Sequence, residues 1–368
     1  MYVMVCAVDI KSGAAHFSIG AQNEAKNPHQ QWRAPAAPHS DYGRRSQLTF
    51  GLFDSLVGSI MLYGSEVWGA CDPSLTNCRL TKYLFDSGSF HKKLQNRICR
   101  MVLGLPKRAP TLAVLGDTGR YPLGLKVLGR VVNYLCKLKF GDNASLAALV
   151  TMLRVTSPEA QHYSWLRGAK NIIEATGKLE TWNAAGTVFP MSKALIKTFR
   201  ETVDSTFKST FTDEWSRRIN AELGPSGEGN KLRTYRTFKT QHQAEEYLKL
   251  SDRSLVGAIS RFRASAHPLK CETDRYHKPK IPYENRICPF CTSNEVEDEA
   301  HFMFRCSKWG TERNVMFEKL ADLQATPSGA DTDEKKMGTL LTNTSLAVLE
   351  AVGDYLKTTF QERRKLAA

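Results

Sequence analysis

The sequence predicts a mainly α-helical protein, with a helical bundle region followed by a small basic α domain that ends in a cysteine- and histidine-containing module. Three observations predict this fold. Apolar residues recur every three or four positions through most of residues 48–223, as they do on one face of a helix. Basic residues concentrate after position 230, and a compact set of cysteines and a histidine follows within 285–309.

The composition indicates a folded, intracellular protein. Of its 368 residues, 42% are hydrophobic and 24% are charged, which is ordinary for a globular chain. Nine cysteines, an odd number that is thinly spread outside 285–309, favour a reducing compartment, nuclear or cytoplasmic. No apolar run approaches the roughly 18–20 residues that span a bilayer, so we expect no membrane segment. The net charge of +14 favours an anionic partner, nucleic acid before an acidic membrane surface.

The chain divides into four parts by pattern. Residues 1–47 lack a sustained periodicity, and we expect a disordered leader. Residues 48–223 form the helical region. The glycine- and proline-rich stretch at 224–230 is the clearest linker, and 231–368 form the basic C-terminal domain.

The helical pattern defines the elements in order. We expect helices over or near residues 52–63, 94–102, 122–138, 144–154, 161–176 and 192–222, and one or two closing helices over 334–365. The first of these should be buried, Gly104 and Pro106 should end the second, and Pro122 suits the first turn of the third. The longest helix carries an apolar stripe that indicates core packing: Leu195, Phe199, Val203, Phe207, Phe211, Trp215 and Ile219.

The segment 231–286 is the most basic part of the chain. It contains 13 basic and 6 acidic residues, a net charge of +7, with tyrosine and phenylalanine between them. Such a mixture can follow a phosphate backbone and stack on bases, although an exposed charged face or pairing with nearby carboxylates would explain it equally. The candidate nucleic-acid contacts are Lys231, Arg233, Arg236, Lys239, Arg261, Arg263, Arg275 and Arg286.

Cys288, Cys291, His301 and Cys306 form a C-x2-C-x9-H-x4-C pattern, the strongest chemical signal in the chain. Three thiolates and one imidazole suit a structural, tetrahedral Zn²⁺. Buried cysteines with a core histidine, or a remnant that has lost its metal, would look the same. His301 and Cys306 lie about 140° apart on an ideal helix, so a helix starting near 297 should bend or end near Cys306.

The acidic run between Cys291 and His301 has a possible supporting role. We expect one of its carboxylates to accept the second imidazole N–H, and the others to be solvated or near a helix N-terminus. The run consists of Glu295, Glu297, Asp298 and Glu299.

Three other residues are of types that can bind ligands or catalyse reactions. We expect Cys271 to lie in the core, and His267 to make either a phosphate contact or a structural hydrogen bond. Asp117 stands in a Gly-Asp-Thr-Gly sequence typical of aspartic proteases, but its single copy and helical context exclude that activity.

Several blocks resemble the C-terminal region of reverse transcriptases from LINE-type (non-LTR, jockey-like) retrotransposons. Residues 52–69 resemble the segment that follows the catalytic palm, and 97–105 and 113–123 resemble the helical thumb or connector. Residues 229–239, 263–269 and 272–276 resemble the run into the zinc element, and 297–306 the element itself. The resemblance covers about 48–365 and rests on the order of these blocks.

The resemblance implies nucleic-acid binding, to template RNA or target DNA, without catalysis. The family's palm holds Mg²⁺ on an Asp-Asp pair. This chain has no adjacent Asp-Asp pair, and neither the palm nor the endonuclease of the family is present. We therefore expect a non-catalytic fragment with no catalytic residues. The alternatives are an accessory part of a larger reverse transcriptase, truncated by the gene model, and a zinc-stapled protein-interaction module.

Overall fold

The computed structural model describes residues 3–9, 14–20, 42–71, 75, 80–85, 89–140, 164–184, 192–221 and 231–367. The chain separates into two compact units, Met1–Asp41 and Tyr42–Ala368. The expected linker at 224–230 and the expected helix at 144–154 lie outside the described residues.

The first unit contains an antiparallel hairpin of strands β1 (Val3–Asp9) and β2 (Ala14–Gly20), paired from Val3 with Gly20 to Asp9 with Ala14. The expectation of a disordered leader differs from the structure at these two segments. The physical reason lies in composition: two apolar segments that contain β-branched valine and isoleucine can pair as strands even without helical periodicity.

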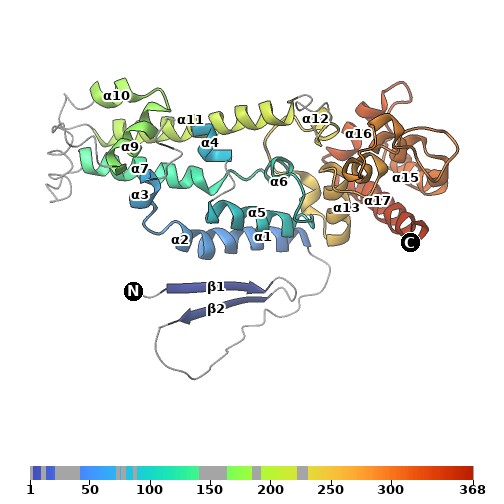
Figure 1. The fold of residues 1–368 in the computed structure, drawn as a ribbon, viewed down its shortest axis with the longest axis horizontal. Coiled ribbons are helices and arrows are strands. Elements are labelled where there is room, and N and C mark those ends of the chain that lie inside the picture. The colour runs from blue at the N-terminus through green and yellow to red at the C-terminus, as the bar shows by residue number, and fades with distance from the viewer. Residues whose placement is uncertain are drawn as a thin grey trace. The chain divides into compact units, whose positions relative to one another are not determined.

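The regular elements described in the second unit are helices, which confirms the mainly α prediction (Figure 1). Its N-terminal helices run from the start of the unit to the centre of the chain: α1 (Tyr42–Leu52), η1 (Phe53–Val57), α2 (Gly58–Met61), α3 (Ser65–Trp68), η2 (Gly69–Cys71), α4 (Leu80–Phe85), α5 (Phe90–Val102), α6 (Thr111–Thr118), α7 (Leu123–Phe140), α9 (Ser164–Glu174), α10 (Leu179–Ala184) and α11 (Lys193–Ile219).

The remaining helices are shorter until the last: α12 (Tyr235–Phe238), η5 (Glu246–Lys249), α13 (Arg253–Arg263), α14 (Lys270–Thr273), η6 (Asp274–Tyr276), η7 (Tyr283–Asn285), η8 (His301–Arg305), η9 (Ser307–Trp309), α15 (Gly310–Asp322), α16 (Asp333–Leu341) and α17 (Leu346–Leu366). Among the described helices none is by itself long and apolar enough to cross a membrane. Only the bent pair Ser46–Met61 and Ser65–Cys71, at 63° to each other, reaches that length and composition together.

Helix α11 shows how the sequence pattern produces the core. Ser192 caps it by accepting a hydrogen bond from the backbone N–H of Leu195. The stripe from Phe199 to Ile219 steps by four residues and is buried, while Leu195, at its start, is exposed. Helix α11 packs beside α7 and α6. Trp215 Nε1 donates to the carbonyl of Leu112. The course of α11 is shown in Figure 1. Core packing, as expected, explains these aromatic residues.

The first helical segment is only partly buried, contrary to expectation. Phe53 is buried, but Leu48, Leu52, Leu56 and Ile60 are 57%, 58%, 44% and 39% exposed. Because α1, η1 and α2 follow one another without a break, these four positions form an outward row spaced by four residues. An apolar helical pattern indicates which residues share a face, but another element must cover that face to bury it.

Residues on both sides of 222–230 share one hydrophobic core. That core joins Val131 of α7 and Phe207 of α11 with Leu255 of α13 and Leu356 of α17. A separate basic domain is therefore not shown among the described residues. Gly119 illustrates the connection: its φ is +61°, and a Cβ there would lie 2.3 Å from the backbone nitrogen of Ala244. Only glycine allows both that conformation and that approach.

Candidate metal centre

Two short segments bring the four predicted ligands together. An antiparallel bridge between Ile287 and Val296 closes the loop that carries Cys288 and Cys291. The second segment is η8, a π-helical turn that begins at His301. Its i to i+5 hydrogen bond, from the backbone N–H of Cys306 to the carbonyl of His301 at 2.8 Å, sets these two residues one above the other. This turn resolves the angular problem of a regular helix and ends at Cys306, as expected.

The four donor atoms have the spacing of a tetrahedral metal site. All of them lie within 4.8 Å of one another. Cys288 Sγ and Cys306 Sγ are 3.9 Å apart, and Cys291 Sγ and His301 Nε2 are 3.4 Å apart. For bonds of about 2.3 Å to sulfur and about 2.0 Å to nitrogen, tetrahedral edges are about 3.8 Å and about 3.5 Å respectively. The group can therefore hold a metal ion without rearrangement.

Burial and outer hydrogen bonds fix the ligands. Cys288, His301 and Cys306 are buried, and Cys291 is half-buried at the rim. Glu295 Oε2 lies 3.3 Å from His301 Nδ1 and also accepts a 2.6 Å hydrogen bond from Arg305 Nε. A carboxylate on Nδ1 directs the imidazole so that Nε2 faces the cysteines. This geometry matches the expectation that one carboxylate of the acidic run supports the histidine.

The proton balance of the site follows from its polar contacts. Burial opposes protonation of His301, but hydrogen bonds with Cys288, Glu295 and Cys291 outweigh burial and raise its pKa to about 9. The hydrogen bond with Cys306, together with burial, raises the pKa of Cys288 to about 12, and the same bond lowers the pKa of Cys306. Metal binding at this site must therefore release protons.

Aromatic side chains surround the ligands. Phe302, the neighbour of His301, stacks on Phe360 of α17 with ring centroids 4.7 Å apart and meets Trp309 edge-on at 5.8 Å. The hydroxyl of Tyr355 donates to the carbonyl of Phe302 at 2.7 Å. The site is thus continuous with the main core.

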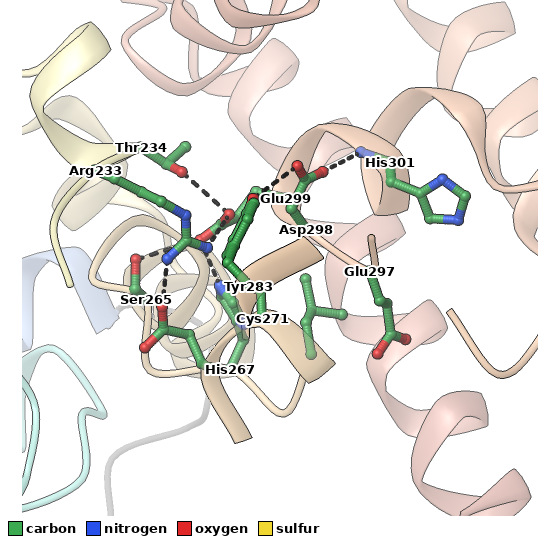
Figure 2. A network of polar contacts seen from close by, with 12 residues as sticks. Arg233, Thr234, Ser265, His267, Cys271, Tyr283, Glu297, Asp298, Glu299 and His301 are labelled. Carbon is green, nitrogen blue, oxygen red and sulfur yellow. Dashed lines mark hydrogen bonds and ion pairs between the residues drawn. The ribbon is translucent and has the colours of Figure 1, made fainter. Parts of the chain in front are cut away.

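Glu297 and Glu299 face inward, which differs from the expectation that they are solvated or near a helix N-terminus. Glu297 is buried and accepts two hydrogen bonds from Arg363 at 2.8 and 2.7 Å. Glu299 is buried among Arg233, Thr234, Ser265 and His267, as Figure 2 shows. Burial opposes ionisation of Glu299, but Arg233 and His267 outweigh it and hold the pKa of the carboxyl far below its usual range.

Asp298 has a different role from its two neighbours. Its Oδ1 accepts a 2.8 Å hydrogen bond from the backbone N–H of His301 (Figure 2). This contact satisfies a backbone donor at the start of the ligand-bearing turn, as an N-cap does. The expectation of a carboxylate near a helix N-terminus is therefore correct for Asp298.

Three of the residues predicted to contact nucleic acid are buried in this structure, and their side chains have internal partners. Arg263 is buried and donates to Asp117 at 3.0 and 2.9 Å. Lys239 is buried against Glu245. Arg286 is buried and donates to backbone carbonyls, including that of Cys271 at 2.7 Å. Side chains with saturated, buried partners do not present their charge to a phosphate.

The other five candidate side chains differ in their exposure and in whether a carboxylate pairs with them. Arg233 and Arg275 both lie against Glu272, at 2.6 and 3.4 Å, and are mostly buried. Lys231 and Arg236 are half-buried and Arg261 is exposed. Among the described residues, these last three have no carboxylate within 4.0 Å. Arg233 and Arg275 are thus paired with neighbouring carboxylates, which is the alternative to a phosphate contact.

Cys271 and His267 both have structural positions. Cys271 is fully buried, as expected for a core residue. His267 Nε2 lies 2.9 Å from Glu299 Oε1, so its contact is structural. His267, Cys271 and Glu299 have donor atoms within 4.8 Å of one another. Arg233 already supplies a positive charge to this group, so its geometry gives no reason to place an ion there.

Asp117 has a structural role that the sequence pattern did not indicate. It lies in α6, is 2% exposed, and accepts hydrogen bonds from Tyr235, Tyr247 and Arg263. Burial raises its pKa, but the charge and hydrogen bonds of Arg263 prevail and lower it. The carboxylate is fully engaged, which agrees with the exclusion of protease chemistry. No local signal pointed to this role, because its partners lie more than 100 residues away along the chain.

Comparisons of the chain with models of protein families, with curated proteins and with solved structures found no match.

Proposed function

We propose that this protein is a non-catalytic, zinc-stapled helical protein that binds nucleic acid and resembles the C-terminal region of LINE-type reverse transcriptases. The observation that carries the proposal is the geometry of Cys288, Cys291, His301 and Cys306 in a chain of net charge +14. A metal site within the main core stabilises a large basic protein, and basic proteins attract nucleic acid.

The donor set favours Zn²⁺ among the ions of the cell. Three sulfurs and one imidazole nitrogen are soft or borderline ligands, which exclude Mg²⁺ and Ca²⁺ on chemical grounds. Four protein ligands leave no position for a substrate, so the ion has a structural role. Zinc would lock the 287–296 loop onto η8 and so onto α17.

Metal analysis with a single substitution tests the zinc assignment. The purified chain should contain one equivalent of zinc by elemental mass spectrometry, and Cys291→Ser should reduce it and lower the melting temperature. Cys71→Ser, at an exposed cysteine outside the site, is the matched control. Full zinc content and an unchanged melting curve in Cys291→Ser would refute the assignment.

Salt-dependent binding tests the nucleic-acid part of the proposal. We expect a labelled 20-mer of uridine or deoxythymidine to bind the full chain, with log K falling linearly as log[salt] rises. Binding that is absent at low salt would leave only the metal-stapled fold. A comparison of the two oligomers would show whether RNA or DNA is preferred.

A second candidate function is association with another protein, because of the exposed apolar row Leu48, Leu52, Leu56 and Ile60. Contiguous exposed apolar side chains are typical of interaction surfaces. This row fits an accessory part of a larger reverse transcriptase. Sequencing of transcripts upstream of codon 1 tests that idea, since a palm with a Phe/Tyr-x-Asp-Asp motif would support it and a stop codon in frame would contradict it.

A further inference from the structure

A cavity of about 690 Å³ lies in the helical region, away from the metal centre. Its walls come from the η1–α2 stretch, from the loop at 119–122 and from facing sides of α7 and α11, which pack against each other (Figure 1). This volume is within the range of about 300–1,000 Å³ that is usual for ligand sites. None of the residues predicted from sequence to contact nucleic acid lines this cavity.

Basic side chains outnumber acidic ones in the cavity wall. Arg120, Lys126, Arg130 and Lys208 line it, against the two carboxylates of Asp54 and Asp204. This leaves a net charge of +2 on a recessed surface. Charges of one sign in a low-dielectric recess concentrate the field and attract an oppositely charged ligand.

The pairing of these charges leaves part of the positive charge uncompensated. Asp54 serves two cations, Arg120 at 2.5 Å and Lys126 at 3.6 Å. Asp204 pairs with Lys208 at 2.7 Å, and Arg130 donates to the backbone carbonyl of Leu62. Among the described residues, Arg130 has no carboxylate within 4.0 Å. An incoming anion could therefore share Lys126 and Arg130 without breaking a tight ion pair.

Tyr121 adds a rigid aromatic wall. Its ring is held from behind by Phe211, edge-on with centroids 5.6 Å apart, and by His242 at 4.9 Å. A preorganised ring loses little entropy when a flat ligand stacks on it. Cations beside a fixed aromatic ring match the two parts of a nucleotide, its phosphate and its base.

A second, smaller cavity extends the site along the seam of α7 and α11. It has a volume of about 230 Å³ and shares Gly129, Asn133 and Asp204 with the first. Arg200 and Glu201 add one basic and one acidic side chain to its wall. The two cavities therefore lie next to each other along the seam, an arrangement that suits a chain of nucleotides better than a single compact ligand.

We infer that this cavity, lined by Arg120, Lys126, Arg130 and Lys208 beside Tyr121, holds the phosphodiester backbone and a base of single-stranded nucleic acid. The inference rests on the proposed function and moves the binding site from residues 231–286 to the α7–α11 seam. A recess of this size accommodates one or two nucleotides, and the rest of the strand would follow the seam.

The test is fluorescence anisotropy with a labelled 20-mer of deoxythymidine over a salt series. The variant Lys126→Gln/Arg130→Gln removes the two cations that the anion would share in the cavity. Each phosphate contact on a single strand contributes about 0.7 to the slope of log K against log[salt]. We therefore expect the slope to shrink by about 1.4 and the affinity to fall by roughly 25-fold at 0.1 M salt.

Two further variants separate the cavity from net charge and from misfolding. Lys249→Gln/Lys319→Gln removes the same charge from exposed positions paired with Glu246 and Asp354, and should leave affinity within about threefold of wild type. Asp204→Asn removes a carboxylate from the cavity and should tighten binding several-fold, a gain that damage to the fold cannot produce.

The outcomes test nucleic-acid binding by the protein separately from the assignment of the cavity as its binding site. Wild-type protein that fails to bind the oligomer at low salt would overturn the proposed function, and this inference with it. Wild-type protein that binds, together with a cavity variant that loses no more affinity than the Lys249→Gln/Lys319→Gln control, would overturn the cavity assignment alone. Loss in the cavity variant and gain in Asp204→Asn would support it.

Discussion

Arg263 provides the sharpest test of how the structure uses its basic residues. The sequence suggests a phosphate contact, whereas the structure buries this side chain at the junction of α6, η5, α13 and α16. Its guanidinium donates to both oxygens of Asp117, to Glu245 at 3.1 Å and to the carbonyl of Leu341 at 2.7 Å. The substitution Arg263→Gln shortens the side chain and removes its charge.

The expected cost follows from what the substitution leaves behind. Asp117 would remain buried without its cation, and removal of one partner from a buried ion pair costs about 3–5 kcal/mol. Tyr235 and Tyr247 would still donate to the carboxylate, so we expect the lower end of that range, about 3 kcal/mol. Nucleic-acid affinity measured under folding conditions should not change.

The assay is urea denaturation followed by circular dichroism, combined with the salt series on the deoxythymidine oligomer. Lys249→Gln is the control, because its exposed pair with Glu246 should contribute under about 1 kcal/mol. A free energy of unfolding within 0.5 kcal/mol of wild type for Arg263→Gln, with a salt slope reduced by about 0.7, would refute the structural role and indicate a phosphate contact.

Three other predictions concern separate parts of the fold. Burial among aromatic rings lowers the pKa of His242 to about 4, so its neutral form is favoured in the folded state. The free energy of unfolding should therefore keep its full value above the unfolded pKa of about 6.5 and fall by about 1–2 kcal/mol as the pH drops toward 4. His242→Phe should reduce this decline when the melting temperature is measured as a function of pH. A Cβ on Gly168 would lie 1.7 Å from the carbonyl oxygen of Ala70, so Gly168→Ala should lower the free energy of unfolding by about 1–3 kcal/mol in urea denaturation. Gly257→Ala is the control, because a Cβ there has nothing within 4 Å, and it should be neutral or stabilising in the same assay. Glu295→Gln should weaken zinc binding about 10- to 100-fold in competition with a chelating dye, and unchanged affinity would exclude its role in orienting the histidine.

Much of the helical architecture was predictable, because helical periodicity is local. The pattern around 192–222 predicts α11 (Lys193–Ile219) to within three residues, and the glycine and proline after Val102 end α5 as expected. The metal ligands were predictable for the same reason, since their spacing within 19 residues restricts the chain to a few compact conformations. The pairing of 3–9 with 14–20 was missed because both apolar segments are short, although the sequence between them contains Ser12-Gly13, a dipeptide typical of turns.

The burial of individual charged residues could not be predicted from their neighbours in the chain. Arg263 and Arg275 carry the same charge in the same basic segment, yet one meets Asp117 across 146 residues and the other meets Glu272 three residues away. A long-range carboxylate decides whether a basic residue is internal, and no pattern in the segment itself identifies that partner. Exposure of Leu52 and Leu56 has a similar origin, because covering a helix face requires a neighbouring element.

The sequence by itself determined the mainly helical class, the positions of most helices and the set Cys288, Cys291, His301 and Cys306. These features depend on contacts between residues close in the chain. The tertiary structure alone decided which cations are buried, which apolar face stays exposed and where α7 and α11 enclose a basic cavity. Those features depend on which distant segments meet, and burial of an ionic group requires its partner to be present there.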